Sequence, residues 1–334
     1  MNRNFVLITA ILALSLSWMG CDKAGKLDQP SAFTPPAGPV ELKLKWPLGE
    51  HVVYEMTMKM NSEFTVPGQS TPMKQEMTMG QEYGLTVFKA LPDGGHEVEM
   101  EFLNARMKMG MGGKTMMDYD SRKKSSAEKA DPVGDIFGKI VGAKIQYFLN
   151  ASNEVDRLEG INELMQRLSS GPQAAALAPL KSMFSDGYFK QMMSQNRFVP
   201  PKPVQPGDTW PVQMEFPMGG IGTMGLDYKF TFQSWEKHGL RECARLEFEG
   251  TIKNKPDLDQ KANPSGMSIG NLDGTTSGTS WFDPELGIII DTTMNQDISM
   301  VMNMSMPGKG GAGSKQSITN QMNQVMSIKL SSVK

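Results

Sequence analysis

The sequence predicts a mostly β protein of the α+β class: one large curved antiparallel sheet or open half-barrel, with a helical segment packed on its concave face. Apolar and polar residues alternate along most of the chain. In Glu97–Phe102, for example, Val98, Met100 and Phe102 alternate with glutamates, as expected for a strand buried on one face. Glycine, proline and asparagine turns recur at the spacing of a meander. One stretch, at about residues 160–196, changes to helical spacing.

The first twenty residues have the features of a signal peptide. Arg3 precedes an apolar run, Phe5–Leu16, that is too short to span a membrane. The run leads to Gly20 and Cys21, which resemble the lipobox of bacterial lipoproteins, where a small residue precedes the cysteine that is acylated. The resemblance implies cleavage after residue 20 and lipidation of Cys21. It also implies a lipid anchor in the cell envelope, with the body facing the periplasm or the extracellular side.

A tether and one domain are predicted after the signal peptide. Residues 21–40 contain four prolines among small and polar residues, a composition typical of a disordered tether. Residues 41–334 are predicted to form a single β-rich domain. Cys243 is the second of the two cysteines in the chain. With Cys21 acylated it is a lone buried thiol; the alternative is a disulfide between the two after cleavage further upstream.

The first half of the domain is predicted to consist of strands joined by tight turns. The inward face of the first strand is formed by every second residue from Val52 to Met60. Leu91–His96 has the composition of a hairpin turn, and Asn150–Asn153 is expected to join strands at 144–149 and 154–158. Further strands are expected near residues 77–87, 97–102, 107–111 and 114–120.

Helical spacing indicates several short helices before residue 197. A short helix is expected at 132–141. Ile161, Leu164, Met165 and Leu168 then form one apolar stripe. Two more stripes follow at 177–184 and 188–193. A curved sheet is the large apolar surface that such stripes can cover.

The proline-rich stretch Phe198–Phe216 is predicted to separate this half from a second half made almost entirely of strands. Both halves open with proline, glycine, an acidic residue and an alternating strand, which suggests two related β units. Strands are expected at 228–233, 244–249, 279–282, 288–294, 298–306 and 322–330. A loop is expected at about 253–278.

Several functional classes are disfavoured by the sequence. The net charge is −2 and Arg122–Lys124 is the one basic run, so no nucleic-acid-binding surface is expected. Gly220–Gly225 matches a dinucleotide-binding motif but leads into a strand, and Gly266–Gly270 matches a nucleophile elbow but lies in a loop. The three histidines lack metal-ligand spacing, which favours exposed residues over a zinc site assembled by the fold. No catalytic residue, metal ligand or cofactor is assigned.

Methionine is the most unusual feature of the composition. Of 29 methionines, 27 lie after residue 20, many as Met-x-Met, a spacing that places both thioethers on one face of a strand. The methionines can fill a core, line a deformable site for an apolar ligand, or bind Cu(I). For copper, Met300–Met306 beside Met56–Met60 is the expected place. The side chains expected to line a ligand site between sheet and helices are Met56, Met58, Met100, Leu164, Leu168, Leu180, Phe184, Phe189, Met300 and Met302.

From Trp46 to the end, the chain resembles a family of exported bacterial lipoproteins of unknown function. The stretches that carry the resemblance are Pro47–Glu50, Val141–Leu149, Glu154–Gly160 and Pro200–Trp210. The architecture is also similar to that of periplasmic lipoprotein carriers, whose curved sheet holds acyl chains under helices. These resemblances imply an anchored β-rich body and supply no catalytic residue.

The favoured function is therefore a membrane-anchored, non-enzymatic protein that binds a lipid or another apolar ligand between sheet and helices. A structural or assembly lipoprotein with a protein partner, and a methionine-rich Cu(I)-binding module, are the alternatives. The sequence leaves the oligomeric state open.

Overall fold

A computed structural model describes residues 36–65, 67–68, 71–123, 137–170, 187, 190, 198–217, 222–255, 267–306 and 314–334. The elements in chain order are β1 His51–Thr65, β2 Met73–Ala90, β3 His96–Met111, β4 Lys114–Asp120, β5 Lys144–Leu149, β6 Val155–Glu159, α2 Ile161–Ser169, β7 Thr209–Pro217, β8 Thr223–His238, β9 Arg241–Lys255, β10 Met267–Asp283, β11 Ile288–Met306 and β12 Ser314–Val333.

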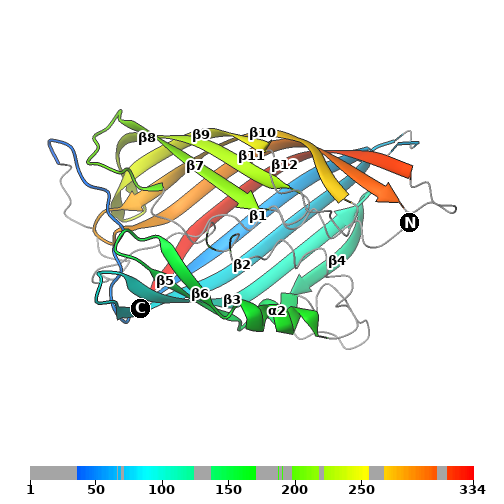
Figure 1. Ribbon diagram of the computed structural model, residues 1–334. Helices are drawn as coiled ribbons and strands as arrows, with labels where there is room; N and C mark the ends of the chain where they lie inside the picture. Colours follow the sequence, from blue (N-terminus) through cyan, green and yellow to red (C-terminus); the bar gives the residue numbers. More distant parts are fainter. Residues whose placement is uncertain are drawn as a thin grey trace.

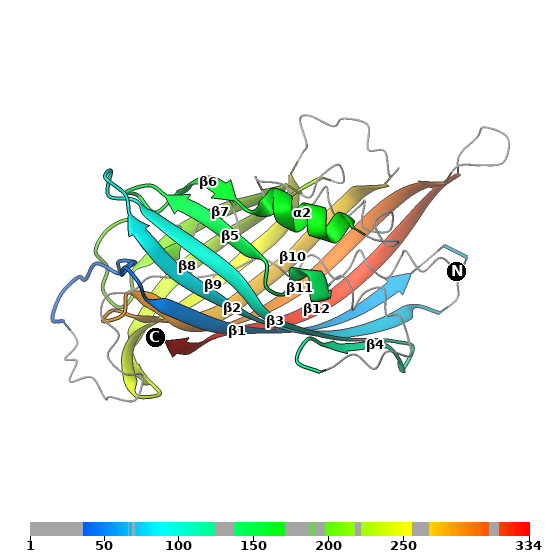
Figure 2. The same ribbon diagram turned by 90° about the horizontal axis from the view of Figure 1, so that it is seen from below.

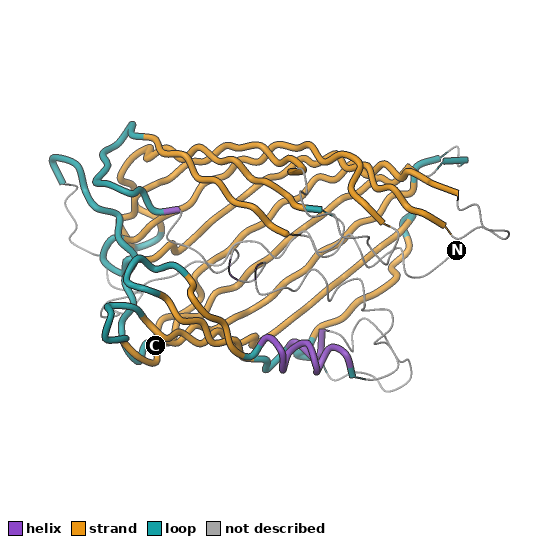
Figure 3. The backbone as a smooth tube through the Cα atoms, in the orientation of Figure 1, coloured by secondary structure: helices purple, strands orange, loops and turns teal. Residues whose placement is uncertain are grey.

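The strands form one 12-stranded antiparallel sheet in the order β6-β5-β3-β2-β1-β12-β11-β10-β9-β8-β7, with β4 paired to β3 outside this path. The sheet curves into an open half-barrel (Figure 1; Figure 3). It is joined at its centre, where the first strand pairs along almost its whole length with the last strand, from Val52↔Val333 to Thr65↔Thr319. β6 and β7 are the two free edges, so the sheet does not close between them. The predicted fold class is confirmed.

The strand period follows directly from the sequence. Along β1, side chains alternate between buried and exposed, and the buried set runs from Val52 to Phe64. The same alternation in the other long strands gives the sheet an apolar concave face and a polar convex face. On the convex face, Asn323 donates to Asp297 at 2.8 Å and Gln321 donates to Ser299 at 2.8 Å, so cross-strand polar pairs cover the outside.

The predicted division of the chain corresponds to the opening of the sheet. β1 to β6 run from the centre of the sheet to one edge, and β7 to β12 return from the other edge to the centre. The stretch Phe198–Phe216 leads into and includes most of the edge strand β7. Pro211 lies within the edge strand β7, where a missing backbone N–H removes no bond from an interior ladder.

The helix α2 continues the β6 rim of the sheet (Figure 2). Its buried residues are Ile161, Leu164 and Leu168, which belong to the same hydrophobic core as the concave face; this confirms the first predicted apolar stripe. Gly160 precedes the helix with φ 89°. A Cβ there would lie 2.4 Å from the Lys144 carbonyl oxygen, so only glycine fits.

Two other helix predictions have different outcomes. Of the expected helix at 132–141, residues 137–140 are helical and 132–136 lie outside the described residues. The stripes at 177–184 and 188–193, which include Leu180, Phe184 and Phe189, lie almost entirely outside the described residues.

The prediction of a loop at 253–278 is wrong for 253–255 and 267–278, which are strand, while 256–266 lie outside the described residues. β9 extends to Lys255 and β10 begins at Met267. The small and polar residues of β10 have weak strand propensity, but β9 and β11 pair with it on both sides, and ladder formation outweighs local propensity. Gly278 has a specific role here: a Cβ would lie 2.3 Å from Cζ of Phe248.

Candidate ligand-binding face

One half of the concave face carries a continuous row of methionines. Cross-strand pairing places Met107 of β3 opposite Met79, Met79 opposite Met58, Met58 opposite Met326, and Met326 opposite Met294 of β11. Four strand spacings make this methionine row about 19 Å long. All five side chains are at most 4 % exposed. The fold thus assembles from five adjacent strands an apolar surface that no single Met-x-Met run contains.

The same row continues as aromatic rings in the other half of the face. Beyond Gly278, which lies opposite Met294, come Phe248, Phe230 and Trp210. Trp210 stacks on Phe230 with ring centroids 5.7 Å apart, and Phe230 lies 5.2 Å from Phe248. Aromatic side chains have few rotatable bonds, whereas thioether side chains adapt to irregular shapes.

A patch of polar side chains interrupts the apolar face beside the methionine row. Gln324 and Gln296 pair across β12 and β11, and Thr276 continues the line on β10. The Nε2 atom of Gln324 donates to Oε1 of Gln296 at 3.1 Å. Asn320 and Ser62 lie close by on β12 and β1, and we call these five residues the polar patch. Each is at most 5 % exposed.

Tyr228 lies next to the polar patch, across Gly250 from Thr276. Burial raises the pKa of the Tyr228 hydroxyl well above its ordinary value, and the neighbouring Thr276 hydroxyl opposes this shift. The hydroxyl therefore stays protonated at neutral pH and can act as a neutral hydrogen-bonding group.

The residues predicted to line a ligand site fall into separate places. Met58 lies in the methionine row and Met56 is the next inward residue on β1, while Met100 lies nearer the other end of β3, opposite Leu85 and Ile145. Leu164 and Leu168 face the core from α2. Met300 and Met302 lie on β11 and are 3 % and 6 % exposed. Leu180, Phe184, Phe189 and Cys21 lie outside the described residues.

The prediction that Met300–Met306 lies beside Met56–Met60 is wrong. In the register, Met60 lies in line with Gln324 and Gln296, whereas Met300 lies in line with Asn320 and Phe64. The two runs are thus offset by four residues, about 13 Å along the strands. Strand register, which the spacing of methionines does not encode, decides which thioethers meet.

A segment before β1 links the two free edges at one end of the half-barrel. We call Val40–Trp46 the strap; it runs down the left end in Figure 1. At one side Val40 N–H donates to the Val204 carbonyl at 2.7 Å, and at the other Trp46 Nε1 donates to Asn153 Oδ1 at 2.7 Å. Between the strap and β7 lies a groove of about 910 Å³. The strap thus ties the ends of a sheet that does not close on itself.

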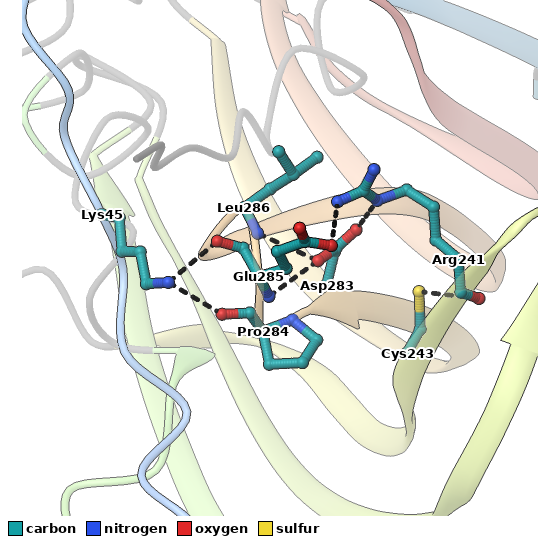
Figure 4. A network of polar contacts seen from close by, with 7 residues as sticks. All are labelled: Lys45, Arg241, Cys243, Asp283, Pro284, Glu285 and Leu286. Atoms are coloured by element: carbon teal, nitrogen blue, oxygen red, sulfur yellow. Dashed lines mark hydrogen bonds and ion pairs between the residues drawn. The ribbon is translucent and has the colours of Figure 1, made fainter. Parts of the chain in front are cut away.

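A network of polar contacts holds the strap to the sheet (Figure 4). Lys45 Nζ donates to the carbonyls of Pro284 and Glu285 at 3.0 and 2.8 Å. In the same turn, Asp283 accepts a hydrogen bond from Arg241; the two side chains are 1 % and 5 % exposed. Burial, together with the charge of Asp283, raises the pKa of the adjacent Cys243 thiol. A protonated buried thiol is a poor nucleophile.

The described parts of the two motifs lie at strands. Gly222 precedes the strand β8 and Ser268 lies within β10, so among the described residues neither motif leads into a helix. The three histidines lie apart: His51 contacts Thr86, His96 contacts Trp46 and His238 contacts Asp291. Within the described part of the chain, no group of three or more His, Cys, Asp or Glu residues could hold a metal ion. Among the helices that the structure describes, none has the length and apolarity needed to cross a membrane.

Sequence comparison places the chain in a family. Residues 93–289, more than half of the chain, match the family described as "Family of unknown function (DUF6263)", and the protein belongs to it. Three of the four stretches that carried the resemblance lie inside this match, and Pro47–Glu50 lies outside it. A comparison with curated proteins gives no match.

Comparison with solved structures gives remote likenesses. A lipovitellin structure concerned with lipid–protein interactions has 9 % identity and a TM-score of 0.40, covering 87 % of this chain and 26 % of that chain. A proposed exported protein with a YmcC-like fold from Bacteroides fragilis has 12 % identity and a TM-score of 0.27, with coverages of 88 % and 100 %. A proposed lipoprotein from Parabacteroides distasonis has 12 % identity and a TM-score of 0.27, with coverages of 89 % and 100 %.

The polar patch is the feature that sequence reasoning missed. A signal was present, because Gln296, Asn320 and Gln324 occupy inward positions of otherwise apolar alternation. Each such residue is unremarkable alone. Only the register brings them together on one part of the face.

Proposed function

We propose that this protein is an exported, membrane-anchored lipoprotein that holds a lipid or a similar long apolar molecule against the concave face of its open sheet. It acts by binding rather than by catalysis. The observation that carries the proposal is the methionine row, which continues into stacked aromatic rings on a sheet whose edges do not pair.

The physical argument rests on the shape and softness of this face. A row of about 19 Å is long enough to accommodate much of an extended acyl chain. Thioethers adapt to chains of different length and unsaturation, because the side chain is unbranched and polarisable. Sites for apolar ligands are largely apolar, with few polar groups that fix orientation. The face offers both kinds of group.

The chemistry of the buried groups supports binding over catalysis. Tyr147, Tyr228 and Cys243 are buried, and burial raises the pKa of each. Groups that catalyse at neutral pH need a pKa near 7. Held protonated, these side chains serve packing and hydrogen bonding.

Localisation to the cell envelope rests on the N-terminal sequence. The apolar run Phe5–Leu16 and the Gly20–Cys21 pair provide export and an acyl anchor. Metabolic labelling with an alkyne-bearing fatty acid tests this. We expect label on the wild-type chain and none after Cys21→Ser; an unlabelled wild-type chain would refute the anchor.

Ligand binding is tested on the full-length protein extracted from bacterial membranes in mild detergent. Native mass spectrometry is expected to show adducts of lipid mass at about one per chain, with mixed chain lengths. Met58→Asp places a charge in the methionine row and should abolish the adducts, whereas Lys59→Asp, on the opposite face of the same strand, should keep them. Circular dichroism checks that both variants fold. A wild-type mass equal to that of the acylated chain alone, together with no uptake of an uncharged apolar fluorophore, would refute the proposal.

Cu(I) binding is a second candidate, because the methionine row gathers thioethers, which are ligands for soft metals. Replacing Met58, Met79 and Met326 by leucine keeps the apolar volume and removes the sulfur. If Ag(I), a redox-stable substitute for Cu(I), binds the wild type and not this variant while lipid adducts are unchanged, the metal function is supported. If Ag(I) does not bind the wild type, this candidate is refuted.

A further inference from the structure

The polar patch contains buried groups that lack hydrogen-bond partners. Both polar atoms of the Asn320 side chain, Oε1 of Gln324 and Oγ of Ser62 have no partner within the protein. These side chains are 1 %, 1 % and 2 % exposed. Buried polar groups in folded proteins are almost always paired, so several unpaired groups in one place require an explanation.

The unpaired groups lie along a stretch of about 13 Å on β12, from Asn320 to Gln324, with Ser62 beside its middle. Ser62 lies opposite Met322, which is two residues from Asn320 and two from Gln324. Ser62 is therefore a diagonal neighbour of both, at about 7–8 Å between Cα atoms. The groups comprise one amide donor, two carbonyl acceptors and one hydroxyl that can do either. The inward residues around them include the apolar Met60, Phe64, Met300 and Met322. The buried Gln75 lies opposite Ser62 on β2 and donates to the Met109 sulfur at 3.3 Å.

The patch carries no charge. The buried charged residues of the described chain are Arg241, Asp283 and Asp291. Arg241 and Asp283 pair with each other, and Asp291 pairs with His238 and Lys329. Asp291 is five residues before Gln296 on β11, about 17 Å away along the strand. A carboxylate or phosphate in the patch would therefore be buried without a counter-charge, which is strongly unfavourable.

We propose that the polar patch binds the glycerol and ester groups of an uncharged acylglycerol, whose acyl chain lies along the methionine row. This inference rests on the proposed function and specifies its ligand class. The Asn320 amide donates to an ester carbonyl, while the Asn320 and Gln324 carbonyls accept from glycerol hydroxyls. Ser62 completes the set. An acylglycerol has both kinds of group and no charge, whereas a fatty acid carboxylate lacks hydroxyl donors.

The test uses delipidated full-length protein loaded with an uncharged pyrene-alkane as fluorescent probe. Glycerol monooleate and oleate are added as competitors, and the displacement constants are compared. We expect glycerol monooleate to bind at least about tenfold more tightly than oleate. The double variant Asn320→Leu/Gln324→Met keeps the side-chain volumes and removes the polar atoms. It should bind glycerol monooleate about tenfold more weakly and the pyrene-alkane unchanged.

A matched control lies on the same strand. Asn323→Leu/Gln321→Met makes the same chemical changes on the convex face and should leave both affinities unchanged. Ser62→Ala removes a single hydroxyl and provides a milder variant if the double variant does not fold; it should weaken glycerol monooleate binding severalfold.

The outcomes separate the two proposals. If the wild type does not take up the pyrene-alkane, the proposed lipid-binding function itself fails. If it binds the probe, but glycerol monooleate binds no better than oleate or the patch variants bind it as the wild type does, the acylglycerol inference is overturned. The patch then holds water only.

Discussion

Replacing Asp283 by alanine is expected to lower the free energy of unfolding more than a substitution at an exposed position. Asp283 ends β10 and is 1 % exposed. It accepts a hydrogen bond from the buried Arg241. Its Oδ1 atom also accepts the backbone N–H groups of Glu285 at 2.8 Å and Leu286 at 3.0 Å. One carboxylate thus pairs a buried charge and closes the turn to which the strap is attached.

The magnitude follows from what is left unpaired. Removing one partner of a buried ion pair costs about 3–5 kcal/mol, because the remaining charge stays in a medium of low polarity. Arg241 keeps its bond to Glu285 at 3.0 Å, which lowers this cost, but two backbone N–H groups lose their acceptor at about 1–3 kcal/mol each when buried. We expect a net loss of about 4 kcal/mol in the free energy of unfolding.

Equilibrium urea unfolding, followed by tryptophan fluorescence, measures this loss. Glu285→Ala is the matched control: its carboxylate is 54 % exposed, so the loss should be below about 1 kcal/mol. The double variant Arg241→Met/Asp283→Ala should recover about 2 kcal/mol of the single-variant loss, because no uncompensated charge remains. A loss below about 1 kcal/mol for Asp283→Ala, or no recovery in the double variant, would refute the reasoning.

Three further predictions concern other parts of the fold. Burial lowers the pKa of His96 below its ordinary value of 6.5, so the unfolded chain binds a proton more readily than the folded chain. The free energy of unfolding should therefore fall as pH drops below 6.5. His96→Phe should reduce this pH dependence in thermal melts between pH 7 and 5. The Cys243 thiol, buried and with a raised pKa, should react with maleimide only after unfolding; rapid labelling of native protein would contradict its placement. Gly278→Ala brings a Cβ within 2.3 Å of Phe248 and should cost about 1–3 kcal/mol, whereas Gly38→Ala should cost nothing measurable by urea unfolding.

Much of the architecture could be predicted because it depends on local chemistry. Apolar alternation predicted the strands and the concave face, and the spacing of Ile161, Leu164 and Leu168 predicted α2. The proline-rich stretch from Phe198 predicted the division that became the opening of the sheet. The loop prediction failed at 253–255 and 267–278, where residues with weak strand propensity belong to β9 and β10 because neighbouring strands pair with them.

The candidate site was predicted only in its composition. The sequence by itself determined that the methionines of the alternating strands face inward. Side chains in a strand alternate between two faces, and the polar residues that alternate with these methionines face water. The tertiary structure decided which methionines meet. It also decided that Gln324 and Asn320 lie unpaired beside Ser62, and that the strap ties the free edges. These depend on strand register and on contacts between residues such as Trp46 and Asn153, more than one hundred positions apart. Pairing over such distances is set by the whole sheet, and no local pattern of residues encodes it.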